Sequence, residues 1–494
     1  MFEKITPEQA GVSSDRVADF ISLLNRRGMA MHSVLLMKGD KLFAEYYWAP
    51  FHKDFCHRMY SETKSYVSIA IGLLIEDGKL SLDDKIVSHF PDKCPPEIDG
   101  FLADQTVRDM LMMETLGQPR NWFTADDEPD RTRLYMEKRG YTPRASGTIW
   151  EYDSAGSQVL AALVERLSGK SLFDFLYERI FDKLGTFRTA TVLKTKTEDS
   201  WGDSALLCTT RDMASFARFL MNYGVWNGER LMNEAYIREA TSALVCNNAD
   251  GWGGVFRDGY GYQIWRTEQN GFAFVGMGDQ LTVCLPDYDL IFVCTADNQG
   301  YPAARKMLIN ALFDYIVYPM KKEALASDTA AEARLAEVTD HMKLRCTSGE
   351  KSSAFAKELD GKVYVCKKNP MGITRFSFRF TENGGELCYT NAQGDKVLPF
   401  GICENRFAKF PEYGYSDGHG GLVTTDGFLY DAAISGAWVE EKKLMIIFQI
   451  IDRYFGNGTA IFAFKGEEAT VSMVSTAENF LKEYQGVAVA HLEK

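Results

Sequence analysis

The segment 60–64, with the sequence YSETK, places a serine three positions before a lysine. A serine hydroxyl is a poor nucleophile until a base removes its proton. Residues i and i+3 share one face of a helix, so the amine of Lys64 can reach the oxygen of Ser61. Residues 62–77 are apolar on nearly all sides and predict a buried helix, where burial favours the neutral amine that can accept a proton. We therefore predict that Ser61 is a nucleophile and that Lys64 is its base.

The same spacing occurs a second time, between Ser348 and Lys351. There the surroundings are polar and no apolar helix follows, so we expect this pair to lie on the surface. A serine and a lysine at this spacing also fit an ordinary N-cap serine with a solvated lysine one turn later. It is the buried helix after Ser61 that favours the catalytic interpretation.

Two more segments could complete such a site. Tyr152 precedes a predicted helix, where its hydroxyl could pass a proton to a leaving group, although a half-buried packing role fits this tyrosine as well. Gly276 and Gly278 precede an apolar strand, and a glycine backbone can approach a substrate closely. A backbone N–H at this point could form an oxyanion hole together with the N–H of Ser61. An ordinary glycine turn would give the same sequence.

An α/β unit must position these residues, and both ends of the first 320 residues contribute strands to it. Four apolar segments predict two hairpins, at residues 32–37 with 42–48 and at residues 281–285 with 290–294. Helices are expected at residues 14–27, 62–77, 155–168, 171–184 and 303–318. We therefore expect one sheet assembled from both ends of residues 1–320, with the helical middle either packed against it or forming a second lobe.

The chain changes character after residue 320. Residues 321–340 are rich in alanine and in charged side chains and predict a linker helix. Residues 341–494 hold short alternating runs that glycine, asparagine and aspartate interrupt. This pattern predicts an antiparallel β-barrel domain of about lipocalin size.

Composition limits the partners. The net charge is −13, and an acidic surface repels nucleic acid and anionic membranes. No apolar run approaches the roughly 20 residues of a membrane span, and the first residues do not resemble a signal peptide. We expect a cytoplasmic protein, with an exported or lipid-anchored form as the lesser alternative. The ten cysteines form no CxxC pair and the seven histidines form no HExxH motif, so no disulfide, metal or other cofactor is expected.

In order and spacing, these elements resemble the serine β-lactamase and penicillin-binding-protein superfamily. The branch they resemble most is class C-like, with family VIII esterases, D-aminopeptidases and 6-aminohexanoate-dimer hydrolases. The resemblance covers residues 5–318 and is carried by Ser61–Lys64, by the segment 147–152 with its tyrosine, and by the helix after it. It implies a β-lactamase-like α/β fold over residues 1–320, which is an antiparallel sheet flanked by helices plus a helical lobe. It also implies an acyl-enzyme mechanism with Ser61, Lys64 and Tyr152 as catalytic residues. The domain from residue 341 resembles the lipocalin-like barrels appended to some of these hydrolases.

The chain departs from the family pattern at two places. Ser154 stands where the family has an asparagine, and the segment 276–278 (GMG) stands where the family has a cation followed by threonine and glycine. That cation normally meets a substrate carboxylate, so its absence favours an uncharged small ester or amide over a penicillin. We assign Ser154, Gly276, Gly278 and Asp279 to substrate or oxyanion binding.

Alternatives stay open at this point. A penicillin-binding or sensor-type protein with slow or no turnover would keep the same motifs. An α/β-hydrolase would need a G-x-S-x-G motif, which occurs at residues 414–418 with His419 beside it, but glycines and β-like sequence follow instead of a helix. The substrate is not named by the sequence, and assembly into a homo-oligomer is neither indicated nor excluded.

Overall fold

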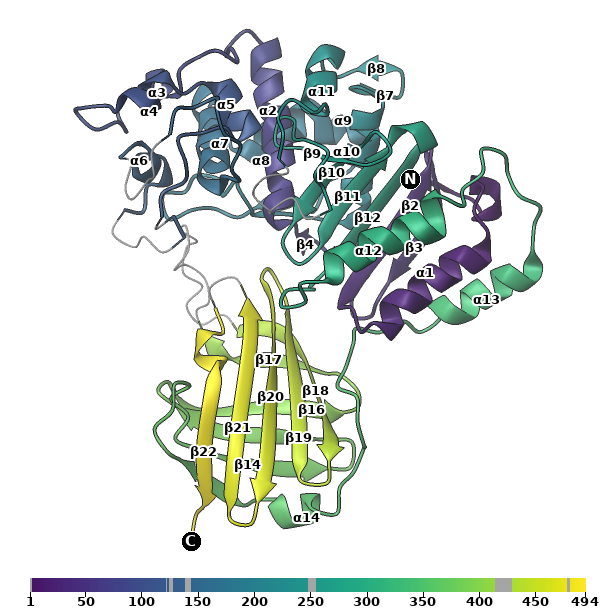
Figure 1. Ribbon diagram of the computed structural model, residues 1–494, viewed down its shortest axis with the longest axis vertical. Helices are drawn as coiled ribbons and strands as arrows, with labels where there is room; N and C mark the ends of the chain where they lie inside the picture. Colours follow the sequence, from purple (N-terminus) through teal and green to yellow (C-terminus); the bar gives the residue numbers. More distant parts are fainter. Residues whose placement is uncertain are drawn as a thin grey trace. The chain divides into compact units, whose positions relative to one another are not determined.

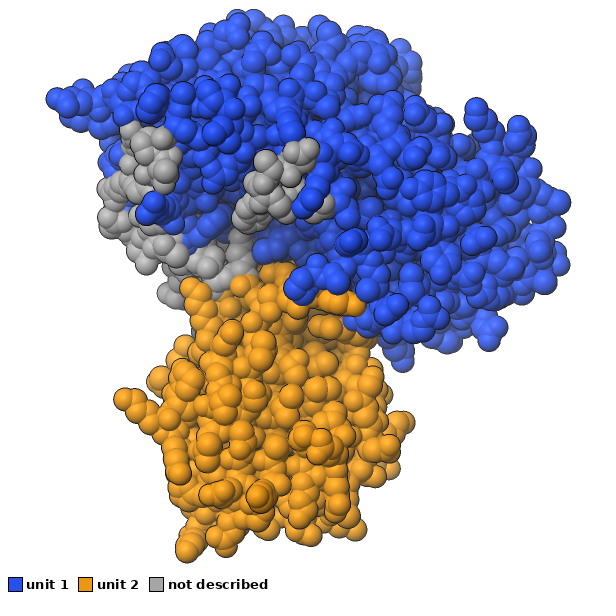
Figure 2. Space-filling model, viewed as in Figure 1, with its two compact units in different colours: residues 1–298, 302–343, 417–423 blue, residues 299–301, 344–416, 424–494 orange. Residues whose placement is uncertain are grey.

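The computed structural model describes residues 2–120, 122–123, 128–137, 144–247, 255–413, 429–477 and 480–494. These residues divide into two compact units, which Figure 2 colours separately. Unit 1 holds the described residues up to Asn298 together with Pro302–Lys343, and unit 2 holds Gln299–Tyr301 and the described residues from Leu344 onward. None of the helices within these ranges has the length and apolar character that a membrane span needs.

A seven-stranded sheet forms the centre of unit 1 (Figure 1). Its strands lie in the order β1 (Glu3–Lys4), β3 (Lys41–Tyr47), β2 (Met31–Lys38), β12 (Leu290–Ala296), β11 (Gln280–Leu285), β10 (Gly271–Gly276) and β9 (Trp265–Thr267). All neighbours are antiparallel except the two-residue pairing of β1 with β3. The two predicted hairpins are present, and they meet where β2 pairs with β12. Strand β12 is buried along its whole length, which explains its unbroken apolar sequence.

Helices cover both faces of this sheet. Helix α1 (Ser14–Arg26) packs on one face through Phe20, whose ring contacts Phe292 of β12 at 6.1 Å between centroids. Side chains alternate along a strand, so the neighbours of Phe292 face the other way, into the core that includes α10 (Thr210–Met221). Two more helices lie beside α1 in Figure 1, α12 (Ala304–Leu312) and α13 (Thr329–Thr339).

The helical lobe is built around α2 (Thr63–Glu76), which is buried from Thr63 to Leu74 as its apolar sequence predicts. Helices α7 (Ser154–Ser168) and α8 (Leu172–Leu176) pack against it. The lobe also contains α3 (Ile86–His89), α4 (Gly100–Asp104), α5 (Val107–Met112), α6 (Arg131–Met136), α9 (Asp182–Leu184) and α11 (Glu234–Ala240). A small sheet joins its base, in the order β4 (His57–Arg58), β6 (Leu206–Cys208) and β5 (Thr191–Val192).

Three predicted helices differ from the observed ones. The helix expected over 303–318 is α12 followed by a wider π turn at Phe313–Val317. The helix expected over 171–184 is divided into α8, a wider π turn at Tyr177–Phe181, and α9. The segment expected as a linker helix is helical only as α13, which belongs to unit 1. Arg334 of α13 forms ion pairs with Asp15 at 2.9 Å and Asp19 at 2.6 Å, so α13 is fastened along α1.

Unit 2 is a β-barrel, which confirms the predicted fold. Its strands are β13 (Val363–Cys366), β14 (Arg375–Thr381), β15 (Gly384–Asn391), β16 (Gly394–Ile402), β17 (Arg406–Tyr413), β18 (Leu429–Glu440), β19 (Lys443–Ile451), β20 (Phe455–Lys465), β21 (Glu468–Ala477) and β22 (Gly486–Leu492). Nine of them close into a barrel because β16 pairs in parallel with β18, while β17 adds to β18. Aromatic rings fill the interior, among them Phe376 and Phe378 against Phe462.

One polar cluster is buried in unit 2. The carboxylate of Glu412 forms an ion pair with Lys396 at 3.1 Å and accepts hydrogen bonds from Asn391, at 2.9 Å, and from the hydroxyl of Tyr484. Glu412 is fully buried and Lys396 is 8% exposed. A buried charge pair of this kind holds its strands in register, because separating the partners would leave a charge without compensation.

Candidate active site

Ser61 lies in a 3₁₀ turn, Tyr60–Glu62, directly before helix α2. The amine of Lys64 is 3.0 Å from the hydroxyl of Ser61 and donates a second hydrogen bond, at 2.6 Å, to the backbone carbonyl of Asp203. Ser61 is partly exposed, whereas Lys64 is only 2% exposed. The structure thus brings the predicted nucleophile and base together, with Ser61 partly exposed and the amine of Lys64 shielded from water.

The backbone before Ser61 adopts an unusual conformation. Tyr60 has a φ of +48°, in the left-handed region that non-glycine residues rarely occupy. Its ring is buried and lies 4.5 Å from the guanidinium of Arg58, and the N–H of Met59 donates to the carbonyl of Leu206 at 2.8 Å. A non-glycine residue in this region costs about 1–3 kcal/mol, which the surrounding packing must offset. The turn therefore presents Ser61 in a fixed direction.

Tyr152 also reaches this place. Its ring stacks on Trp265 at 5.7 Å between centroids, and the amine of Lys64 lies 5.3 Å from the centre of the tyrosine ring. The next residue, Asp153, is the N-cap of α7 and accepts a hydrogen bond from the backbone of Gly156 at 2.9 Å. Burial raises the pKa of this carboxyl. Ser154 is the first residue of α7, so the helix start fixes the backbone around Tyr152.

The glycine segment predicted to line the oxyanion site is the turn between β10 and β11. A Cβ atom at Gly276 would lie 2.2 Å from the carbonyl oxygen of Met59, so only glycine allows β10 to approach the turn before Ser61 this closely. Gly278 has a φ of +77°, and the next residue, Asp279, has a φ of +73°. The third predicted segment therefore lies beside the nucleophile turn.

The side chain of Asp279 is engaged within the protein. Its carboxylate accepts hydrogen bonds from Arg305 at 3.0 Å and from Asn298 at 3.1 Å. Arg305 donates a further bond, at 3.1 Å, to the carbonyl of Gly276. These bonds hold the turn in place, so Asp279 acts on the backbone of the site and its contact with a substrate stays a prediction.

Arg305, which is bonded to the third segment, and Arg266, on the neighbouring strand, are both engaged with protein groups. Arg305 binds Asp279, and Arg266 of β9 donates to the carbonyl of Thr241 at 2.7 Å and to the side chain of Asn270 at 2.9 Å. The third segment itself has no cation at the position where the family has one, and Arg305 beside it is bonded to Asp279. A substrate carboxylate would have to compete with these existing bonds.

The segment 201–204, with the sequence WGDS, is a fourth segment at the site, because the carbonyl of Asp203 contacts Lys64, and the sequence alone did not identify it. Gly202 lies so close to α7 that a Cβ atom there would be 2.1 Å from the Cβ of Ala161. The carboxylate of Asp203 accepts hydrogen bonds from the indoles of Trp201, at 3.0 Å, and Trp122, at 3.4 Å. A tryptophan followed by a glycine only weakly indicates such close packing. None of the residue types in this segment predicts a contact with Lys64.

Glu62, next to the nucleophile, points into the core. It is 0% exposed, and one of its oxygens accepts a hydrogen bond from the hydroxyl of Thr282 at 2.6 Å. Among the described residues the other oxygen has no hydrogen-bond partner. Burial raises the pKa of this carboxyl to about 8, against the hydrogen bond from Thr282, which lowers it. Glu62 is therefore mostly protonated at neutral pH.

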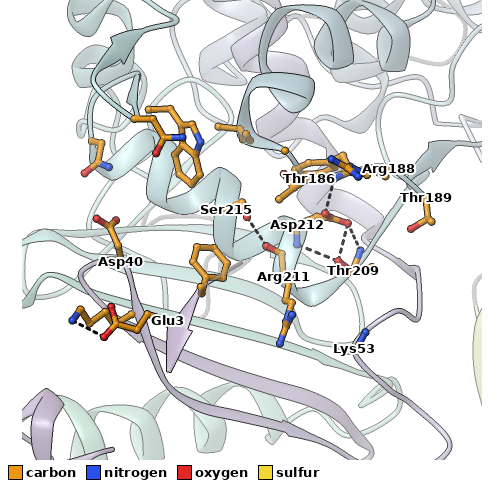
Figure 3. A pocket seen from close by; sticks show the side chains of 18 of the residues that line it. Glu3, Asp40, Lys53, Thr186, Arg188, Thr189, Thr209, Arg211, Asp212 and Ser215 are labelled. Carbon is orange, nitrogen blue, oxygen red and sulfur yellow. Dashed lines mark hydrogen bonds and ion pairs between the residues drawn. The ribbon is translucent and has the colours of Figure 1, made fainter. Parts of the chain in front are cut away.

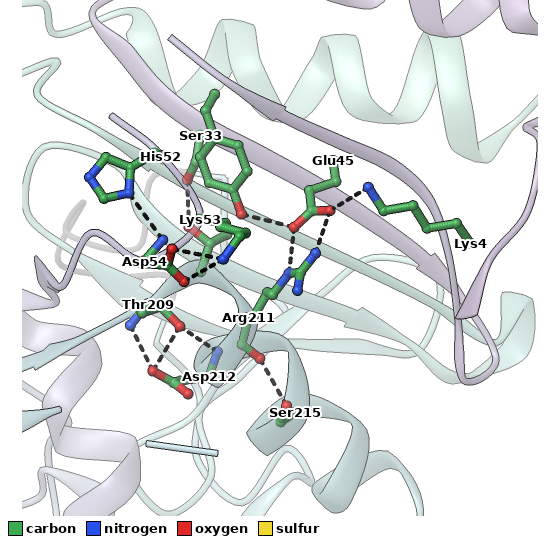
Figure 4. Close-up of polar contacts among 12 residues, drawn as sticks. Lys4, Ser33, Glu45, His52, Lys53, Asp54, Thr209, Arg211, Asp212 and Ser215 are labelled. Carbon is green, nitrogen blue, oxygen red and sulfur yellow. Dashed lines mark hydrogen bonds and ion pairs between the residues drawn. The ribbon is translucent and has the colours of Figure 1, made fainter. Parts of the chain in front are cut away.

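A large groove of about 1220 Å³ lies elsewhere in unit 1, along α10, and none of the predicted site residues lines it (Figure 3). Its charged groups are largely paired within the protein. Lys53 pairs with Asp54 at 2.7 Å, and Arg211 binds both oxygens of Glu45, at 2.5 and 2.8 Å (Figure 4). Asp212 caps the start of α10. The groove offers no arrangement for nucleophilic chemistry.

The rival serines fall elsewhere. Ser348 and Lys351 are both exposed and stand outside any helix, as predicted. The G-x-S-x-G segment at residues 414–418 lies outside the described residues.

Unit 1 is similar in sequence and in fold to known proteins of one hydrolase-containing family. The model of the Beta-lactamase family matches residues 17–314. A 6-aminohexanoate-dimer hydrolase of Paenarthrobacter ureafaciens is 26% identical over 312 residues, which cover 58% of this chain and 78% of that protein. A lovastatin esterase of Penicillium rubens is 30% identical over 147 residues, 25% of this chain and 37% of that protein. The structure of EstCE1, a hydrolase with promiscuous acyltransferase activity, is similar in fold, with a TM-score of 0.51 and 15% identity over 62% of this chain and 99% of that one.

Proposed function

Because the chain belongs to the beta-lactamase family, we propose that it is a serine hydrolase that cleaves a small, uncharged ester or amide through an acyl-enzyme on Ser61. One observation carries the proposal. The hydroxyl of Ser61 lies 3.0 Å from the amine of Lys64, and that amine is almost completely shielded from water. A hydroxyl bound to a buried amine is the arrangement that activates a serine nucleophile without a histidine.

The proposed reaction proceeds in two halves. Lys64, as the neutral amine, accepts the proton of Ser61 while the serine oxygen attacks the acyl carbon. The resulting oxyanion is stabilised by the backbone N–H of Ser61 and by an N–H of the 276–279 turn. The bond to the leaving group then breaks, and Tyr152 donates a proton to the leaving oxygen or nitrogen while it takes one from Lys64. Water next attacks the acyl-enzyme, which releases the acid and restores Ser61.

An uncharged substrate is favoured by the groups around the site. Arg305, beside the 276–279 turn, is already bonded to Asp279 and to the carbonyl of Gly276, and the ring of Trp265, stacked on Tyr152, adds an aromatic surface. The relatives of the chain include an amide hydrolase and an esterase, and both kinds of bond fit the proposed mechanism.

Labelling with a fluorophosphonate, followed by mass spectrometry of the adduct, tests the proposal. Ser61→Ala should abolish both labelling and turnover of a chromogenic ester, whereas the matched surface variant Ser348→Ala should keep both. Tyr152→Phe should lose turnover while circular dichroism shows a folded protein. An adduct on Ser416 would overturn the assignment.

A penicillin-binding or sensor-type protein is the second candidate, and it is favoured by the changed third segment, 276–278 (GMG), which lacks the family's cation. Such a protein would acylate Ser61 and then stall. Pre-steady-state kinetics with the same ester separate the two. A burst of one equivalent without further product would favour the sensor, and continued turnover would favour the hydrolase.

A further inference from the structure

We propose that the carboxylate of Asp203 positions Lys64 for catalysis, by fixing the backbone carbonyl of Asp203 against the lysine amine. The inference rests on the proposed function and adds to it a residue outside the three motifs. Asp203 is a positioning residue, because it acts on the reacting serine only through Lys64.

The amine of Lys64 has two hydrogen-bond partners, and only one of them is the nucleophile. The other is the carbonyl oxygen of Asp203 at 2.6 Å, the shorter of the two contacts. An amine held at a second point cannot swing away from the serine hydroxyl. The carbonyl of Asp203 therefore fixes the position of the Lys64 amine relative to Ser61.

The side chain of Asp203 holds that carbonyl in place. One carboxylate oxygen accepts bonds from the indole of Trp201, at 3.0 Å, and from the hydroxyl of Ser204. The other oxygen accepts a bond from the indole of Trp122 at 3.4 Å. Asp203 is 1% exposed, so water cannot replace these donors. Three donors on one carboxylate leave its backbone little freedom to rotate.

The donors come from separate parts of unit 1. Trp122 lies between α5 and α6, whereas Trp201 and Ser204 flank Asp203 itself. The same loop is bound to the nucleophile segment, because the hydroxyl of Thr63 accepts a bond from the backbone of Leu206 at 3.1 Å. Asp203 thus joins the helical lobe, the loop and the lysine in a single network.

Asp203→Asn is the sharpest perturbation. The amide has nearly the same shape as the carboxylate, but whichever way it is turned, its NH₂ group faces at least one of the three donors. We expect the loop to shift and the carbonyl to lose its alignment with Lys64. The rate of fluorophosphonate labelling at Ser61 and kcat for a chromogenic ester should fall about 10- to 100-fold, with KM changed less than about 2-fold.

A double-mutant cycle separates positioning from general destabilisation. In a Lys64→Met background the base is absent, so adding Asp203→Asn should change the labelling rate by less than about 2-fold. Asp212→Asn is the matched control, because Asp212 is a buried carboxylate that accepts a backbone bond from Thr209 at 2.9 Å (Figures 3 and 4) and another from Phe187 at 2.6 Å. It should lower the melting temperature and leave kcat unchanged.

The outcomes are distinct. Equal losses from Asp203→Asn with and without Lys64 would overturn the positioning role, and so would a labelling rate equal to that of the wild type. Should Asp203→Asn not fold, Trp201→Phe removes one donor and should slow labelling about 2- to 10-fold by the same route; an unchanged rate there would also overturn it. Absence of labelling at Ser61 in the wild type would instead refute the proposed function itself.

Discussion

Replacing Glu62 by glutamine should make the protein more stable at neutral pH, although it alters a residue next to the nucleophile. Burial raises the pKa of this carboxyl to about 8, from an ordinary value of 4.5. Below pH 4.5 the group is protonated in both the folded and the unfolded chain. As the pH rises, the unfolded chain ionises first, so the free energy of unfolding falls by about 1.4 kcal/mol per pH unit until the folded group also ionises.

The loss of stability is set by the pH range between the two pKa values of Glu62, 4.5 in the unfolded chain and about 8 in the folded protein. By pH 7 the wild type should have lost about 3 kcal/mol through Glu62, and above pH 8 about 5 kcal/mol. Glutamine does not titrate in this range. It keeps an acceptor for the hydroxyl of Thr282, which binds Glu62 at 2.6 Å, and its NH₂ group takes the place of the oxygen that has no hydrogen-bond partner among the described residues. The two proteins should therefore be similar at pH 5 and diverge as the pH rises.

Urea denaturation of wild type and Glu62→Gln at pH 5, 6, 7 and 8 measures this divergence. Glu8→Gln serves as a control, since both oxygens of Glu8 are bound by Ser14, at 2.6 and 2.9 Å. That variant should be no more stable than the wild type at pH 7, because its amide can only replace bonds that already exist: its oxygen accepts from the N–H of Ser14 and its NH₂ group donates to the Ser14 hydroxyl. If the difference between wild type and Glu62→Gln did not change from pH 5 to pH 8, the argument from burial would be refuted.

Four further outcomes are expected. Lys64→Arg should lower kcat/KM by about 10²- to 10⁴-fold with an unchanged circular dichroism spectrum, because a guanidinium stays protonated; substantial activity would require another base. Gly276→Ala should slow fluorophosphonate labelling, because the new Cβ would lie 2.2 Å from a backbone carbonyl, whereas Gly100→Ala, which meets nothing within 4 Å, should not. Penicillins and cephalosporins should be hydrolysed more slowly than small esters, since a lost charge-assisted bond of about 1.5–3 kcal/mol costs one to two decades in affinity; efficient cephalosporin turnover would contradict this. Lys396→Met should destabilise the barrel by about 3–5 kcal/mol in thermal melts, and Lys396→Met with Glu412→Gln should recover most of the loss.

Local chemistry made some of the site predictable. The spacing of Ser61 and Lys64, followed by an all-round apolar helix, indicates a buried base beside a nucleophile, and the helix is buried as expected. The hairpins around residues 38–41 and 286–289 were equally visible, because strand and turn signals are short-range.

The features of the fold and the site that the sequence did not predict depend on contacts between residues that are distant along the chain. Asp203 meets Lys64 across 139 positions, and neither its type nor its neighbours point to that contact. The π turn that divides the predicted helix over 171–184 leaves the apolar pattern intact, so periodicity could not detect it. We predicted that Asp279 contacts a substrate, because the sequence does not show that Arg305 and Asn298, from a later segment, bind its carboxylate.

The pairing of β2 with β12 also has a consequence for how the protein is made. Leu290 pairs with Lys38, so the middle of the sheet forms only after almost the whole of unit 1 has left the ribosome. Until then the hairpin of β2 and β3 exposes an apolar edge, and α2 lacks the contact of its Tyr66 with Phe274 of β10. Such late, long-range closure slows folding and leaves the nascent chain open to aggregation. Synthesis of this protein should therefore be more sensitive to chaperone supply than synthesis of its barrel, whose neighbouring strands mostly follow one another along the chain.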